Sequence, residues 1–150
     1  MEARFKEDVR SHCSVNYGLE IFGDKWSLLI IRDIVFAGKK TYGEFLKSDE
    51  GFATNILASR LAFLEEQGIL SKAPNPEDRR KDFYSLTEKG LDLIPLVLNI
   101  VLWSAKHDSK SYVRRSKEFV ARLSQSPLQV SEEVKALVRN GGCMFPESKE

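Results

Sequence analysis

Apolar positions near the start of the chain repeat with the period of an α-helix. A short helix is predicted over Val15–Phe22, ending near Gly23, and a second over Lys25–Ala37, which Gly38 ends. The apolar face of the second helix is formed by Trp26, Leu29, Ile30 and Ile34. The fold is therefore expected to begin with two helices.

Two further helices are predicted after a short loop. Thr41 and Glu44 have the spacing of a capping box, which starts a helix over Tyr42–Lys47. The next helix, Thr54–Gln67, has an apolar face formed by Leu57, Leu61 and Leu64. Its opposite face is small and uncharged, with Asn55, Ala58, Ser59 and Ala62. A solvated helix usually carries Lys and Glu at such positions, so this face is suited to lie close against another surface.

The pattern changes from helical to alternating after Gly68. Ile69–Lys72 is predicted to begin a strand, and Lys81–Leu86 alternates polar and apolar residues as a half-buried return strand does. The segment between them, Pro74–Arg80, is rich in turn-forming residues and ends in basic ones. The sequence predicts a two-stranded hairpin with a charged tip.

A longer helix is predicted from its N-cap Thr87 toward Lys106, interrupted or kinked at Pro95. Its apolar residues lie almost all round the helix, so burial of one face cannot cover them. A partner subunit is the simplest cover, and a dimer interface is predicted at Leu96, Ile100 and Trp103. Both tryptophans, Trp26 and Trp103, are interpreted as core residues and not as ligand platforms.

The chain changes character beyond Ser109. Tyr112–Leu123 is a basic amphipathic stretch, and a capped helix is predicted from Ser131 to Asn140. The tail, Gly142–Glu150, is expected to be disordered. No role is assigned to this C-terminal part.

Length and hydropathy predict a soluble protein with a single domain. A chain of 150 residues suits one domain with a core. The longest apolar stretch, Leu91–Trp103, is shorter than the roughly 20 residues that span a bilayer. Met1–Arg10 is charged and lacks the apolar segment of a secretory signal. We therefore expect a cytoplasmic protein that does not enter a membrane.

The net charge of +1 attracts no polyanion by itself, so a nucleic-acid surface would need local clusters of Lys and Arg. Such clusters occur at Lys39-Lys40, Arg79-Arg80-Lys81 and Arg114-Arg115. An isolated run of this kind is usually only solvated surface. Here, however, the last three predicted helices before the hairpin, the hairpin itself and the helix after it follow the order of a winged helix-turn-helix protein.

In that arrangement the helix Thr54–Gln67 enters the major groove of double-stranded DNA. Reading base edges needs short polar side chains near the start of the inserted helix, and Thr54, Asn55 and Ser59 occupy those positions, with the small Ala58 beside them on the DNA-facing side. Arg60 lies at the edge of the same face and is suited to contact a phosphate. The other predicted phosphate contacts are Lys39, Lys40, Lys47, Arg79, Arg80 and Lys81.

Several segments, in this order and spacing, resemble the HxlR-type regulators, a branch of prokaryotic winged helix-turn-helix transcription factors related to MarR. The resemblance extends over about Cys13–Trp103 and rests on Cys13, Phe22–Ile30, Tyr42–Phe45, Leu57–Leu61, Leu64–Leu70 and Tyr84–Gly90. Ala53 stands where the family commonly has a serine N-cap. The wing residues Asp78-Arg79-Arg80 are more similar to a MarR wing.

The resemblance implies a mainly α fold with a small β-hairpin, DNA binding, and a homodimer held by N- and C-terminal helices. It also implies a response to a small-molecule effector or a reactive electrophile. The domain it defines is residues 1–109, followed by a helical extension with a flexible tail at 110–150. Sequence-specific binding to an inverted-repeat operator is expected, and no cofactor is predicted.

Cys13 and Cys143 are not in a metal-binding spacing, so no zinc site is predicted. Cys13 precedes a short helix whose dipole would favour the thiolate, which suggests a redox or electrophile sensor. The alternative is a small buried residue in the dimer interface. His12 and His107 are interpreted as surface or interface histidines and not as catalytic residues.

An enzyme is not expected, because the chain has no P-loop, GxSxG, HExxH or glycine-rich dinucleotide fingerprint. The stronger alternative is a winged helix that binds only other proteins. Such a module should expose larger apolar anchors than Asn55, Ala58 and Ser59 provide. The residues of this face favour DNA.

Overall fold

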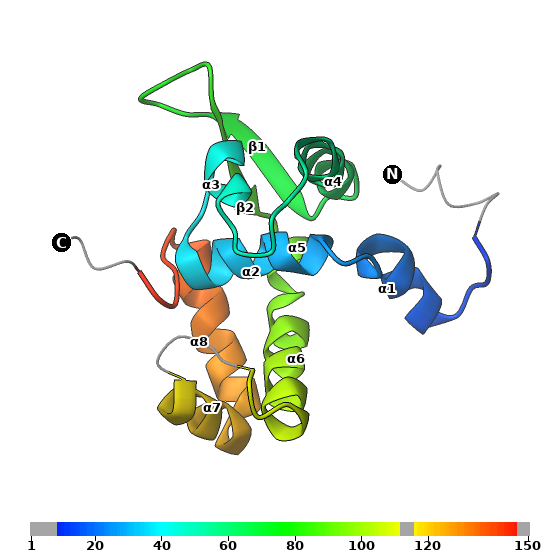
Figure 1. Ribbon diagram of the computed structural model, residues 1–150, viewed down its shortest axis with the longest axis vertical. Coiled ribbons are helices and arrows are strands. Elements are labelled where there is room, and N and C mark those ends of the chain that lie inside the picture. The colour runs from blue at the N-terminus through cyan, green and yellow to red at the C-terminus, as the bar shows by residue number, and fades with distance from the viewer. Residues whose placement is uncertain (1–8, 112–115, 147–150) are drawn as a thin grey trace.

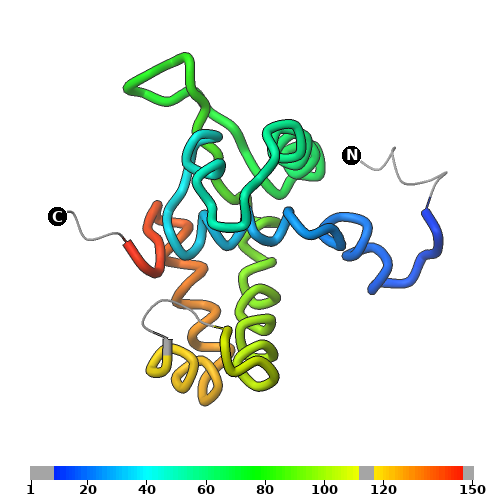
Figure 2. Tube along the Cα trace, viewed as in Figure 1, coloured from blue at the N-terminus to red at the C-terminus, as the bar shows by residue number. Residues whose placement is uncertain are grey.

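The computed structural model describes residues 9–111 and 116–146. Its elements are, in order, α1 (Ser14–Phe22), α2 (Ser27–Ala37), α3 (Tyr42–Leu46), α4 (Thr54–Glu66), β1 (Leu70–Pro74), β2 (Asp82–Leu86), α5 (Glu88–Leu91), α6 (Ile94–His107), α7 (Ser116–Gln125) and α8 (Pro127–Arg139). Figure 1 shows α4 and the hairpin on one side of α2, and α6, α7 and α8 on the other. The tube in Figure 2 shows that the hairpin tip projects beyond the helices. The predicted fold class is confirmed.

Helix α2 runs through the centre of the molecule, and local polar groups set both of its ends. The Asp24 carboxylate accepts hydrogen bonds from the backbone N–H groups of Trp26 and Ser27, both at 2.9 Å. Gly38 ends the helix in the left-handed region, at φ 69°, which a residue without a Cβ adopts at no steric cost. Asp24 therefore acts as a local cap, and the sequence signal at Gly38 is confirmed.

The core lies between α2, α3 and α4 and continues along α6. Leu57, Leu61 and Leu64 of α4 are all buried, as their helical spacing predicts. They belong to one apolar cluster with Phe45 of α3 and Ile30 of α2. Burial of one face of α4 leaves the opposite face at the surface of the molecule.

The hairpin pairs β1 with β2 in antiparallel register, from Leu70 opposite Leu86 to Pro74 opposite Asp82. It is fixed to the helices because the Tyr84 N–H donates to the Lys40 carbonyl at 2.7 Å. This bond joins β2 to the loop between α2 and α3. The hairpin is therefore held beside α3.

Helix α5 begins as the sequence predicts, because the Thr87 side chain accepts a hydrogen bond from the Gly90 N–H at 3.1 Å. The interruption comes earlier than predicted, at Asp92 and Leu93. Pro95 instead lies in the first turn of α6, where the missing N–H removes no helical hydrogen bond. The proline starts the second helix and does not kink a continuous one.

Helices α7 and α8 pack against α6 through the buried residues Leu123, Val130 and Val134. Helix α8 begins at Pro127, so the predicted start at Ser131 is wrong. Ser131 lies inside the helix and is buried. Of the predicted basic stretch Tyr112–Leu123, residues 112–115, with Arg114 and Arg115, lie outside the described residues.

Residues 142–146 differ from the flexible tail that the sequence suggests. The N–H groups of Met144 and Phe145 donate to the carbonyls of Val35 and Phe36 at 2.9 and 2.8 Å. These carbonyls belong to the last turn of α2 and have no partner within that helix. The Phe145 ring also packs edge-on against Phe36, with a centroid distance of 5.6 Å. The chain therefore returns to α2, while residues 147–150 lie outside the described part.

Within the described ranges, no helix has the length and hydropathy to cross a bilayer. The same residues contain no group of three or more His, Cys, Asp and Glu side chains that could hold a metal ion.

Candidate nucleic-acid interface

The outer face of α4 is the first component of the candidate site. Thr54, Asn55, Ala58 and Ser59 are all exposed on it. None of the side chains of Thr54, Asn55 and Ser59 has a hydrogen-bond partner among the described residues. Their donors and acceptors therefore face solvent from a helix whose other face is fixed in the core.

The start of α4 is held by contacts from two directions. The Tyr42 hydroxyl of α3 donates to the Thr54 carbonyl at 3.1 Å. Phe52, buried just before the helix, packs against Trp26 with ring centroids 4.9 Å apart. The N-cap Ala53 supplies no side-chain bond, so the first N–H groups of α4 keep the partial positive charge that attracts phosphates.

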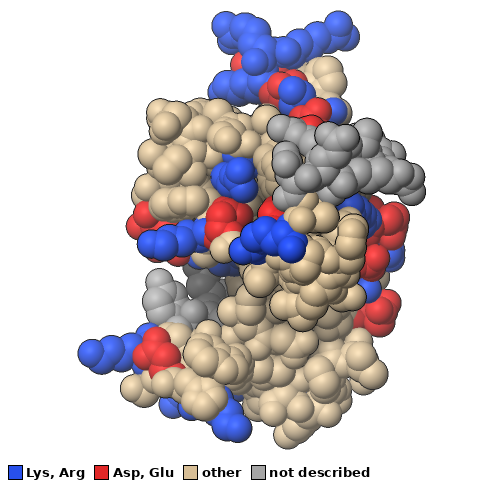
Figure 3. All heavy atoms as spheres, turned by 90° about the vertical axis from the view of Figure 1, so that its right-hand side faces the viewer, with Lys and Arg blue, Asp and Glu red and all other residues tan. Residues whose placement is uncertain are grey.

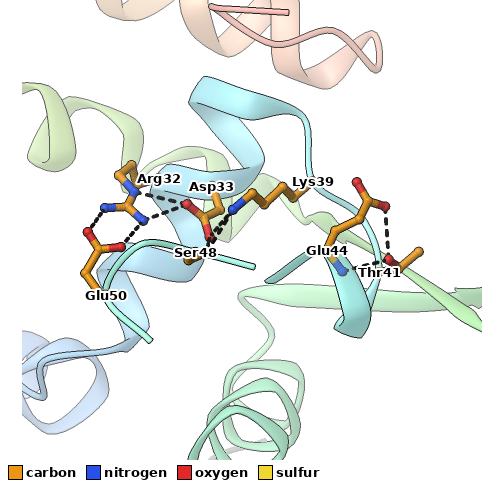
Figure 4. Close-up of polar contacts among 7 residues, drawn as sticks. All are labelled: Arg32, Asp33, Lys39, Thr41, Glu44, Ser48 and Glu50. Atoms are coloured by element: carbon orange, nitrogen blue, oxygen red, sulfur yellow. Dashed lines mark hydrogen bonds and ion pairs between the residues drawn. The ribbon is translucent and has the colours of Figure 1, made fainter. Parts of the chain in front are cut away.

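The predicted capping box of Thr41 and Glu44 fixes the start of α3. The Thr41 hydroxyl oxygen accepts from the Glu44 N–H at 3.2 Å and donates to the Glu44 carboxylate at 3.0 Å (Figure 4). The carboxylate thus reaches back to the hydroxyl of Thr41.

A polar network joins α2 to the turn between α3 and α4 (Figure 4). The Arg32 guanidinium donates to both oxygens of Glu50, at 2.6 and 2.7 Å, and to Asp33 at 2.7 Å. The Ser48 hydroxyl donates to the other oxygen of the buried Asp33 carboxylate. The bidentate contact with Glu50 fixes the turn that sets the angle between the two helices.

The pKa values of the network follow from these contacts. Burial acts to lower the pKa of Arg32, but hydrogen bonds with Glu50 and Asp33 outweigh it and raise that pKa above its ordinary value. The hydrogen bond from Arg32 lowers the pKa of Glu50. Both groups are therefore charged at neutral pH, and the contact is an ion pair.

Lys39 and Arg60 are placed differently from the expectation that both contact phosphates. The Lys39 ammonium donates to the Ser48 hydroxyl at 2.8 Å and lies 3.3 Å from the Asp33 carboxylate. The Arg60 guanidinium lies 3.5 Å from the Asp24 carboxylate and over the Phe63 ring, 4.6 Å from its centroid. Buried or half-buried carboxylates need such partners, so both cations are engaged within the protein.

The remaining predicted cations lie on exposed parts of the hairpin and of α3. Arg79, Arg80 and Lys81 form the hairpin tip, and Figure 3 shows Lys and Arg gathered at this projecting end. The Arg80 guanidinium donates a hydrogen bond to the Asp78 carboxylate at 3.0 Å, and this bond lowers the pKa of Asp78. Lys40 and Lys47 are exposed beside α3. Exposed basic groups thus lie on α3 and on the hairpin, the elements next to α4 (Figure 1).

The sequence analysis missed the residues that orient α3 and α4, above all Arg32, Asp33, Ser48, Glu50 and Tyr42. Their partners lie 12 to 18 positions away along the chain, so no local spacing reveals them. The only available signal was an acid-base pair, Arg32-Asp33, inside an otherwise apolar helix.

A second exposed surface is apolar. Leu96, Ile100, Trp103 and His107 follow one stripe of α6 at i, i+4, i+7 and i+11. Trp103 is 67% exposed and Ile100 43%, so Trp103 is not a core residue as predicted. Trp26, in contrast, packs against the core. In Figure 3 a broad area without charged side chains lies in the lower part, where α6 faces the viewer.

Helix α1 adds exposed apolar side chains of its own, at Val15, Tyr17 and Leu19. Cys13 precedes them as the N-cap of this helix and is exposed. The backbone N–H groups of Asn16 and Val15 lower the pKa of the Cys13 thiol. The thiol is therefore accessible in this chain and is not buried.

These elements together define a winged helix-turn-helix protein, with α4 as the helix that a DNA groove would receive. The chain belongs to the HxlR-like helix-turn-helix family, whose model matches residues 21–112. An uncharacterized HTH-type transcriptional regulator of Mycobacterium tuberculosis is 34% identical over 94 residues, which are 63% of this chain and 58% of that protein. The chain thus spans less than two thirds of this relative's length.

Solved structures show the same fold. PA1607, described as a transcription factor, superposes with a TM-score of 0.62 at 38% identity, over 69% of this chain and 73% of the other. The redox regulator HypR in its oxidized form has a TM-score of 0.56 at 28% identity, over 67% of this chain and all of that one. A MarR-family regulator of Porphyromonas gingivalis W83 has the same TM-score and identity, over 69% and 99%.

Proposed function

We propose that this protein is a transcriptional regulator that binds double-stranded DNA sequence-specifically. Helix α4 would lie in the major groove, and the hairpin wing would lie along the backbone or minor groove. The observation that carries the proposal is the outer face of α4, where the polar groups of Thr54, Asn55 and Ser59 have no partner in the part of the chain that the structure describes. Exposed cations at Lys40, Lys47 and the wing tip are suited to neutralise phosphates of the bound duplex.

The binding unit in this proposal is a homodimer in the cytoplasm. Two chains related by a two-fold axis would place their α4 helices in successive major grooves, roughly 34 Å apart, on an inverted repeat. The stripe of the half-buried Leu96 and the exposed Ile100 and Trp103 supports this assembly, because a partner would remove its apolar surface from water. The exposed apolar residues of α1 would extend the interface.

The first test is fluorescence anisotropy with the purified protein, the DNA upstream of its own gene and a scrambled duplex, over a salt series. Tight binding to the upstream fragment, with a steep salt dependence and two chains per site, is the expected result. Equally weak binding to both duplexes, in reductant and in oxidant, would favour a protein-binding winged helix instead.

Changing Arg79 and Arg80 to Ala together should weaken binding to every duplex by about tenfold and reduce the salt slope by roughly one to two. Asn55→Ala should instead change sequence preference, costing about 1–3 kcal/mol at one base pair. Anisotropy titrations over single-base operator variants measure both effects.

The matched control changes Lys106 and Lys110 to Ala. These are two exposed cations, at the far end of α6 and in the loop after it. This control changes net charge equally and should leave DNA affinity nearly unchanged. An equal loss on all sequences from the wing variant and from Asn55→Ala would contradict the proposed division between backbone and base contacts.

Regulation by thiol chemistry at Cys13 is a second part of the proposal. Its exposure and lowered pKa support attack of the Cys13 thiolate on an electrophile, since the thiolate is the nucleophilic form. Alkylation with iodoacetamide should change the operator affinity of the protein, and should have no such effect in Cys13→Ser. Unchanged affinity of the fully alkylated protein would remove the support for a sensor.

A further inference from the structure

A cavity of about 780 Å³ lies between α2, α6, α7 and the segment 108–111. Sites for small molecules commonly measure roughly 300–1,000 Å³. One wall comes from Leu28, Leu29 and Phe36 of α2, and another from Val97 and Val101 of α6. Its size and apolar walls are suited to the body of a small organic molecule.

The third wall is formed by α7, which lies outside residues 21–112 that match the family model. Val120, Ala121 and Ser124 of this helix line the cavity. The C-terminal extension therefore completes a hollow that α2 and α6 leave open. This gives the extension a role beyond lengthening the chain.

Three charged side chains line the cavity, Arg32, Asp108 and Lys117. Arg32 lines the cavity but is already paired with Glu50 and Asp33. The Asp108 carboxylate accepts a hydrogen bond from the Lys110 backbone N–H at 3.1 Å and keeps its negative charge, since it has no ion pair with a described residue. Lys117 is a cation of this lining with no ion pair to any described residue, and its ammonium can pair with an anionic ligand.

We propose that this cavity binds a small, largely apolar organic anion, such as an aromatic carboxylate or sulfonate. The apolar body lies against Leu29, Phe36 and Val101, and the anionic group pairs with Lys117. Burial of the apolar body supplies most of the affinity, and the ammonium selects the charge. Binding at this site does not depend on the proposed function.

A regulatory consequence does rest on the proposed function. Arg32 lines the cavity on one side and holds Glu50 in the turn between α3 and α4 on the other (Figure 4). A ligand that moves the guanidinium changes the support of this turn and therefore the placement of α4. Occupation of the cavity then alters DNA affinity, and DNA alters ligand affinity by the same factor.

The test uses 1-anilinonaphthalene-8-sulfonate, an apolar aromatic anion whose fluorescence rises on burial, titrated into the full chain without DNA. One saturable site per chain is expected. Ala121→Phe, which fills the cavity from α7, should weaken binding at least tenfold. Ala136→Phe is the matched control, because Ala136 is exposed on α8 and does not line the cavity. It should bind as the unaltered protein does.

Lys117→Met removes the charge from an exposed side chain without changing the packing of the core, and should weaken binding several-fold. The proposal is overturned if the probe does not bind, or if Ala121→Phe and Lys117→Met both bind as well as the control. Loss of binding in Trp103→Ser alone would place the probe on the outer stripe of α6 and would also overturn it.

DNA affinity is then measured by anisotropy with a far-red-labelled upstream duplex, with and without saturating probe. A shift of about fivefold or more is expected in the unaltered protein and none in Ala121→Phe. Probe binding without any DNA binding would refute the proposed function and leave the cavity site standing. If the protein binds both the probe and DNA but the probe leaves DNA affinity unchanged, the link through Arg32 is refuted.

Discussion

A chain carrying Trp103→Glu is expected to be a monomer at micromolar concentration, whereas the unaltered protein is expected to be a dimer. Trp103 exposes 67% of its surface on the outer stripe of α6. A buried tryptophan anchor commonly contributes about 2 kcal/mol or more to an interface. Because the dimer is two-fold symmetric, the substitution removes two such anchors. The dimer dissociation constant should therefore rise roughly a thousandfold.

Sedimentation velocity over a concentration series measures this change directly. The matched control is Leu128→Glu, which places the same charge on α8 at a leucine that is 83% exposed. That variant should remain dimeric. A dimer that survives Trp103→Glu but dissociates with Leu128→Glu would move the interface from α6 to the extension, and the proposed spacing of the two α4 helices would have to be abandoned.

Replacing Gly90 with Ala should cost about 3 kcal/mol of unfolding free energy or more. A Cβ at this buried position would lie 2.3 Å from the Ile69 carbonyl oxygen and 3.0 Å from the Leu86 side chain. The Ile69 carbonyl cannot move freely, because it accepts the Thr87 N–H at 3.1 Å. The new methyl group would therefore separate α5 from the hairpin. Urea unfolding followed by circular dichroism measures the loss.

Gly43→Ala is the matched control for this substitution. Gly43 lies within α3, and a Cβ there would meet nothing within 4 Å. Alanine is the better helix former, so this variant should gain up to about 1 kcal/mol. If the two alanine variants had equal stability, the close approach of Gly90 to the Ile69 carbonyl would not be a constraint on the fold.

Elements with a clear period and a local cap were predictable. Leu57, Leu61 and Leu64 indicated both the existence of α4 and the face that it buries, because their spacing is that of one helical stripe. Thr41 and Thr87 marked the starts of α3 and α5, because an N-cap hydroxyl acts on an N–H only three residues away. Such signals need no knowledge of the rest of the fold.

Predictions that depended on distant partners were less successful. A basic pair at Lys39-Lys40 indicated a phosphate-binding surface, yet Lys39 is engaged with Asp33 and Ser48. Serine is a residue type that favours the N-cap position, but α8 starts at Ser126 and Pro127, and Ser131 is buried inside the helix. The tail looked disordered because its polar composition does not reveal the carbonyl groups of α2 that bind Met144 and Phe145.

The sequence by itself determined the order of the elements, the winged helix-turn-helix class and the uncharged outer face of α4. Periodicity, caps and turn residues act over a few positions, and all of them are written in consecutive residues. Only the tertiary structure decided which cations are free, where the chain returns to α2 and how α7 closes a cavity on α2 and α6. These features depend on contacts between residues far apart in the chain, whose energies arise only after the helices have packed.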